Sequence, residues 1–160
     1  FIICDSPAGI EKGAMMALYF ADEAVIVTNP EVSSVRDSDR ILGVLASKSH
    51  RAEKQLDTIK EHLLITRYSP NRVKKGEMLS IQDVCEILSI PLLGVIPEST
   101  AVLNASNRGV PVTLDEVSDA RHAYDNAVGR LLGENIPLNT GEENWTRKLM
   151  KKLSIFRSPA

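Results

Sequence analysis

The chain has 160 residues, of which 43% are hydrophobic and 25% charged, and its formal net charge is −2. These values are typical of one globular domain and exclude a disordered chain, a collagen-like fibre and a disulfide-dense miniprotein. No apolar run approaches the roughly 18 residues of a membrane span. Cys4 and Cys85 have no second Cys or His at metal-binding spacing, which favours a reducing cytosol over a disulfide framework or a zinc site.

Four short apolar runs predict strands that are covered on both faces. They are rich in Ile, Val and Leu and do not alternate with polar residues. The runs are Phe1–Cys4, Ala24–Thr28, His62–Tyr68 and Leu92–Ile96. The first run starts the chain without a methionine, so we expect a piece whose N-terminal part is absent.

Three helical patterns alternate with these runs. Ser33 or Ser34 is expected to cap a helix that ends near Ser47. Ser80 and Asp83 are spaced as a capping box, and a stripe of apolar positions follows them, so Cys85 is most simply a core residue. The stripe consists of Ile81, Val84, Cys85 and Leu88. A last helix is expected over Ser118–Leu132. The alternation predicts a three-layer α/β fold, a parallel sheet with helices on both faces.

Polar loops follow the carboxyl ends of all four predicted strands. These loops are Asp5–Gly9, Asn29–Glu31, Arg67–Pro70 and Pro97–Thr100. Because parallel strands bring their carboxyl ends to one edge of the sheet, where open α/β sheets bind ligands, the loops predict a polar small-molecule site.

Asp5 is the most informative residue of this edge. A carboxylate after an apolar strand can hold a water of a Mg²⁺ shell, and Gly9 lets a backbone N–H approach a phosphate. An Asp that caps a turn is the alternative interpretation. None of the nine glycines lies in a G-x-x-x-x-G-K-[ST] pattern, so no phosphate cradle accompanies Asp5. Asp5 is thus a candidate Mg²⁺ ligand without a loop to hold the phosphates, which is expected of a piece that lacks its first βα unit; such a piece is expected to be poorly stable, inactive and unable to bind ATP by itself.

The end of the chain is strongly basic. Trp145–Ala160 holds five cations and no acid, so the rest of the chain has a net charge of −7. In a helix, Trp145, Leu149, Leu153 and Phe156 fall within an arc of about 80°. The cations Arg147, Lys148, Lys151 and Arg157 lie outside this arc, and Lys152 can snorkel from its edge. The pattern predicts an amphipathic helix in the plane of a membrane, with a packed terminal helix as the alternative. We expect a domain over residues 1–133, a linker over 134–144 and this membrane-targeting helix over 145–160.

Several segments closely resemble the MinD family of septum-site ATPases, which belongs with ParA to the P-loop ATPases with a deviant Walker A motif. The segments are Cys4–Glu11 (CDSPAGIE), Ala17–Ala24 (ALYFADEA), Thr28–Arg40 (TNPEVSSVRDSDR), Glu61–Leu64 (EHLL), Thr66–Tyr68 (TRY) and Gly94–Glu98 (GVIPE). The resemblance implies a P-loop NTPase-type sheet whose first βα units are missing here, and it implies ATP and Mg²⁺ as ligands.

The resemblance also implies roles for single residues. Asp5 matches the aspartate that holds Mg²⁺ through water, and Gly9 matches the turn beside the γ-phosphate. Arg67, Pro97 and Glu98 match loops near the adenine. An interface for an ATP-dependent homodimer, a MinC-like inhibitor and a MinE-like activator is implied at Glu31, Ser33, Arg36, Asp37 and Asp39.

Two of these interface residues have a second interpretation. Asp37 and Asp39 can also serve as acids that complement the dipole of their helix. Helical steps of four and three are expected to place Asp39 on the same side as Val35 and Leu42, which favours a partner contact.

The resemblance as a whole implies an ATPase that recruits a division inhibitor and helps place the septum. It would be cytoplasmic and reversibly peripheral on the inner face of the bacterial membrane. Anionic lipids would be bound by Trp145, Leu149, Leu153, Phe156, Lys148, Lys151 and Lys152. No specific nucleic acid is expected, because the body is acidic. The alternatives are a ParA-like partition ATPase and a non-catalytic membrane adaptor.

Overall fold

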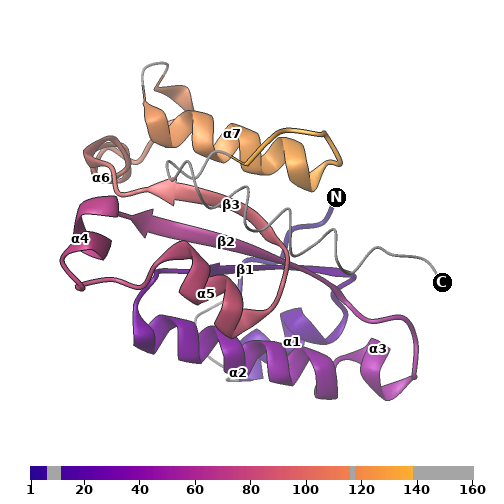
Figure 1. The fold of residues 1–160 in the computed structure, drawn as a ribbon. Coiled ribbons are helices and arrows are strands. Elements are labelled where there is room, and N and C mark those ends of the chain that lie inside the picture. The colour runs from indigo at the N-terminus through magenta and orange to yellow at the C-terminus, as the bar shows by residue number, and fades with distance from the viewer. Residues whose placement is uncertain (7–11, 116–117, 139–160) are drawn as a thin grey trace. The chain divides into compact units, whose positions relative to one another are not determined.

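The computed structural model of the chain describes residues 1–6, 12–115 and 118–138 (Figure 1). It divides into two compact units, Phe1–Leu93 and a second unit that starts at Gly94. Among the described helices, none combines the length and the apolar character needed to cross a bilayer.

Three strands form the sheet, in the order β1-β2-β3. They are β1 (Glu23–Thr28), β2 (Lys60–Tyr68) and β3 (Leu92–Pro97). β1 and β2 run parallel, with Ala24 opposite Glu61 and Ile26 opposite Leu63. Three of the four predicted strands thus form, and the parallel sheet with its helices confirms the predicted α/β class. The expected cover on both faces is wrong for β1, where burial alternates and leaves Val25 and Val27 38% and 58% exposed.

The described residues of the first unit form five helices, and Figure 1 shows α2 and α5 on one face of β1 and β2. They are α1 (Lys12–Tyr19), α2 (Val32–Lys48), α3 (His50–Glu53), α4 (Pro70–Lys74) and α5 (Ile81–Leu88). The core of this unit is aliphatic, and its largest fully buried side chains include Val35, Leu45, Leu63, Ile65, Ile81 and Val84. Burial of these side chains, more than helix propensity, holds such short helices in place.

The predicted capping box starts α5. The Asp83 backbone N–H donates to Ser80 Oγ at 3.1 Å, and the Ser80 backbone N–H donates to Asp83 Oδ2 at 3.0 Å. Both groups would otherwise lack a partner within the helix. The expected cap at Ser33 or Ser34 is wrong, because α2 already begins at Val32, after Glu31.

The second unit contains α6 (Thr100–Asn107), the 3-10 turn η1 (Val112–Leu114) and α7 (Asp119–Leu131). The last of these matches the predicted helix to within one residue at each end. The chain folds back at the end of α7, where Arg130 Nε donates to the Ile136 carbonyl and Nη2 to the Pro137 carbonyl, each at 2.8 Å. A Cβ at Gly129 would lie 2.5 Å from Ile136 Cδ1, so a larger residue there would make the end of the Ile136 side chain shift.

The expected strand over Phe1–Cys4 does not form. Phe1, Ile2 and Ile3 are at least 90% exposed and have no regular secondary structure. A strand is stable only when its N–H and C=O groups pair with a neighbour, and β1–β3 is the only sheet of the described residues. An apolar, β-branched sequence is therefore not sufficient at this position.

Candidate functional site

A side-chain hydrogen bond joins the carboxyl ends of β1 and β2. Thr66 Oγ1 donates to Asn29 Oδ1 at 2.9 Å and also lies 3.4 Å from the Thr28 carbonyl oxygen. All three residues are buried or half-buried. The pair fixes the loop after β1 against the neighbouring strand, at the edge where parallel sheets bind ligands.

Arg67 follows Thr66 and has an unusual backbone. Its φ is +56°, in the left-handed region, and its side chain is exposed. The next residue, Tyr68, is 3% exposed and anchors the strand end in the core. A non-glycine residue in this conformation costs about 1 kcal/mol or more and is kept where the surrounding fold fixes it, often at binding sites. Arg67 is thus a candidate ligand contact on structural grounds as well.

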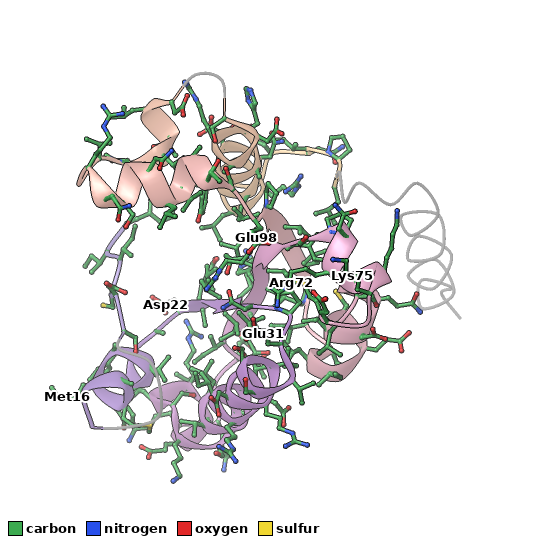
Figure 2. The ribbon with its side chains drawn as sticks, turned by 90° about the vertical axis from the view of Figure 1, so that its left-hand side faces the viewer. Met16, Asp22, Glu31, Arg72, Lys75 and Glu98 are labelled. Carbon is green, nitrogen blue, oxygen red and sulfur yellow. The ribbon has the colours of Figure 1, made fainter. Side chains whose placement is uncertain are left out.

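The loop between β1 and α2 is held from the other side by Arg72. Arg72 Nη2 lies 3.9 Å from Glu31 Oε1, and Nε lies 3.8 Å from Glu77 Oε2. Figure 2 shows Glu31 and Arg72 close together. The Leu79 backbone N–H also donates to the Pro30 carbonyl at 2.9 Å. The start of α2 is therefore tied to the segment between α4 and α5.

Ser33, Arg36 and Asp37 form the outer surface of α2, and all three are exposed. They lie opposite the buried stripe of that helix, which consists of Val35, Ser38, Leu42 and Leu45. Asp37 Oδ1 pairs with Arg40 Nη1 at 3.3 Å, and both side chains are about two-thirds exposed. An ion pair that exposed contributes little to stability, so these charges are available to a partner.

Asp39 lies about one helical turn from Val35 and from Leu42, as expected, but it is exposed whereas those two residues are buried. The helical steps bring Asp39 only to the edge of the buried stripe. Asp39 stays accessible to a partner, but at the flank of the outer surface of α2. Asp37 and Asp39 were expected to complement the dipole of their helix, an effect that is confined to the first turn. Because α2 begins at Val32, its first turn contains neither residue and no other acid, so this interpretation is wrong.

The remaining predicted residues are distributed as follows. Asp5 is exposed in the segment before α1. Pro97 closes β3 and is half-buried, and Glu98 follows it and is exposed; both belong to the second unit. Gly9 and the membrane residues Trp145, Leu149, Leu153, Phe156, Lys148, Lys151 and Lys152 lie outside the described residues.

Asp5 is the candidate metal ligand that the sequence singles out. Over the ranges that the structure describes, no group of three or more His, Cys, Asp or Glu could hold a metal ion by itself. Mg²⁺ is usually bound by one or two carboxylates together with substrate phosphates, and it keeps several waters. An exposed carboxylate such as that of Asp5 fits this mode of binding.

Comparison with known proteins finds close relatives over most of the chain. It is 71% identical over 135 residues to the septum site-determining protein MinD of Neisseria meningitidis, covering 84% of this chain and 49% of that protein. It is 68% identical over 143 residues to the protein of the same name from Escherichia coli K12, covering 89% and 53%. The chain thus spans about half the length of these relatives. No family model matches it.

Solved structures agree with the sequence comparison. The MinD cell division protein of Aquifex aeolicus superposes with a TM-score of 0.73 at 44% identity, over 84% of this chain and 54% of that one. The MinC:MinD cell division protein complex of the same organism gives the same TM-score and identity, over 84% and 52%. MinD of Pyrococcus horikoshii, solved with Mg-ADP, superposes with a TM-score of 0.65 at 25% identity, over 82% and 52%. By sequence and by fold, the chain belongs to the MinD family.

Proposed function

We propose that this chain is part of an ATPase that cycles between cytoplasm and membrane, recruits a division inhibitor and helps place the division septum. The observation that carries the proposal is the 68–71% identity to septum site-determining proteins over 135 to 143 residues. That span is long enough to include the carboxyl edge of the sheet and the outer surface of α2.

We assign the nucleotide to the carboxyl edge. Asp5 would hold a water of the Mg²⁺ shell and Gly9 would lie beside the γ-phosphate, while Arg67, Pro97 and Glu98 would lie near the adenine. A relative solved with Mg-ADP supports this assignment. The Thr66–Asn29 hydrogen bond and the positive φ of Arg67 supply the fixed backbone that such a site needs.

We assign partner binding to Glu31, Asp39 and the outer surface of α2. A relative solved as a MinC:MinD complex supports a MinC-like inhibitor as one partner. A MinE-like activator and the second copy of an ATP-dependent homodimer would use the same region. Glu31 lies in the loop between β1 and α2, 3.9 Å from Arg72, so this partner surface would begin next to the carboxyl edge.

Membrane binding is assigned to Trp145–Ala160. Each cation near an anionic surface contributes about 1 kcal/mol, so one such segment binds weakly once the cost of ordering it is subtracted. Two segments on one dimer gain roughly 10²–10⁴-fold in avidity. ATP-driven dimerisation would therefore drive attachment, and hydrolysis would reverse it.

The partner assignment is tested with the intact protein and a double charge reversal, Arg36→Glu with Asp37→Lys. We expect the variant to keep its fold and to lose ATP-dependent capture of a MinC-like inhibitor. The matched control is Lys48→Glu, which changes an exposed charge at the far end of the same helix. Undiminished capture by the double variant, or equal loss in the control, would remove the outer surface of α2 from the interface.

A further inference from the structure

A cavity of about 240 Å³ lies in the first unit, among α2, α3 and the start of β2. Its lining residues are Leu45, Ala46, Ser49, Ala52, Leu56, Thr58, Ile59 and Glu61. Most of this lining is aliphatic, and Glu61 is its one charged side chain. The cavity is at the opposite end of β1 and β2 from the candidate nucleotide site, since Glu61 pairs with Ala24 near the start of both strands.

Two cations near this end of the sheet, Arg51 and Lys60, are paired with other residues. Arg51 Nη2 donates to Asp22 Oδ1 at 2.8 Å and Nη1 lies 3.4 Å from the Asp57 carbonyl oxygen. Lys60 Nζ lies 3.2 Å from Glu23 Oε1. For the Glu61 side chain, by contrast, no hydrogen bond or ion pair is found to any residue that the structure describes. A carboxylate is thus half-buried in an apolar cavity without a cationic partner.

Burial raises the pKa of the Glu61 carboxyl above its ordinary value. The pKa is raised because the ionised carboxylate is less well solvated at this position than in water. A cation inside the cavity would restore that stabilisation through a charge-assisted hydrogen bond. The lining also includes Ser49, whose Oγ already accepts the Ala52 backbone N–H at 3.2 Å, and Thr58.

We propose that this cavity binds a small primary alkylammonium ion, with its ammonium group on Glu61 and its hydrocarbon chain against Leu45, Ala52 and Ile59. The size of the cavity agrees with this ligand class, because cavities of about 150 Å³ already hold a molecule as large as benzene. A neutral hydrocarbon would leave the carboxylate unpaired, and an anion would be repelled by it. The chemistry of the lining therefore selects a cation with an apolar body.

The probe for the test is n-butylammonium chloride, added to the isotopically labelled intact protein and followed by two-dimensional NMR. We expect saturable shifts at the backbone amides of Leu45, Ala52 and Glu61. Glu61→Gln keeps the shape of the side chain but removes its charge, and it should weaken binding roughly tenfold or more. Glu53→Gln, which alters a nearby carboxylate outside the lining, should change binding less than twofold.

A second variant and a neutral probe test the proposal even if Glu61→Gln disturbs the fold. Ala52→Leu should fill the cavity and abolish the saturable shifts. The neutral probe n-butanol should bind roughly tenfold more weakly than n-butylammonium. The proposal is overturned if Glu61→Gln or Ala52→Leu binds like the parent, if n-butanol binds equally well, or if n-butylammonium shifts no lining amide. Shifts that sodium chloride reproduces would also overturn it, since they would report ionic strength alone.

Discussion

Replacing Thr66 by Val tests the link between the two strand ends at the candidate nucleotide site. Val has nearly the shape of Thr, so the change removes the hydroxyl and little else. It deletes the 2.9 Å bond to Asn29 Oδ1 and the longer contact with the Thr28 carbonyl. A neutral hydrogen bond contributes about 0.5–1.5 kcal/mol, and Asn29 is only half-buried, so water can replace part of the loss. We expect the free energy of unfolding to fall by about 1 kcal/mol.

Urea unfolding of the intact protein measures this loss. The slope of the unfolding free energy against urea concentration should stay the same, which indicates that the variant differs from the parent in stability alone. Thr66→Ser keeps the hydroxyl and should lose less than half as much. Combining Thr66→Val with Asn29→Ala gives a double-mutant cycle, in which the two losses should be clearly less than additive. Additive losses, or a Thr66→Val protein that unfolds at the urea concentration of the parent, would show that the bond does not hold the two strand ends together.

Three further changes test other parts of the structure. Ser80→Ala should cost about 1 kcal/mol, because it removes one half of the capping box of α5, and urea unfolding would show the loss; no loss would contradict the cap. The raised pKa of Glu61 stabilises the fold at low pH, and this contribution is lost as the pH rises through that pKa. Glu61→Gln should therefore raise the urea midpoint at neutral pH and leave it nearly unchanged below about pH 4, and equal midpoints at neutral pH would refute this reasoning. Burial, and to a lesser extent the charge of Glu86, raises the pKa of the Cys85 thiol to about 11. Near pH 8, a thiol reagent should therefore modify Cys85 far more slowly in the folded protein than in the protein unfolded by urea. Equal rates would contradict the burial of Cys85.

The parts of the fold that depend on local pattern could be predicted from the sequence. The capping box at Ser80 and Asp83 involves residues three apart, and the apolar stripe that follows is continuous over one helical face. Buried strands such as β2 show as runs of Leu and Ile. Secondary structure of this kind is encoded within a window of ten or so residues.

The parts that depend on distant residues could not be predicted in the same way. Phe1–Cys4 has the composition of a strand, but pairing with a neighbour decides whether it becomes one. Arg72 meets Glu31 from a position 41 residues away, and Thr66 meets Asn29 from 37 residues away, so no periodicity reveals either contact. The only signal for Thr66 was its place near the carboxyl end of a predicted strand, where polar residues gather around ligands.

The environment of the Glu61 carboxylate also depends on residues that are distant in the sequence. The sequence shows an acid at the start of an apolar run, which would ordinarily lie at the solvated end of a strand. Only the packing of α2 and α3 over β2 places it on the lining of a cavity. Two cations close to it in the sequence, Arg51 and Lys60, pair instead with Asp22 and Glu23.

Co-sedimentation of the intact protein with anionic vesicles tests most directly whether ATP controls membrane attachment. The assay compares ATP with ADP, for the parent and for a variant that carries Leu149→Glu and Phe156→Glu. We expect the parent to sediment with the vesicles in ATP and to stay in solution in ADP. The variant should not attach, because its apolar arc now carries two charges. Equal sedimentation of the parent in both nucleotides would indicate a constitutive membrane adaptor instead of an ATP-controlled switch. A variant that sediments like the parent would show that Trp145–Ala160 does not mediate attachment.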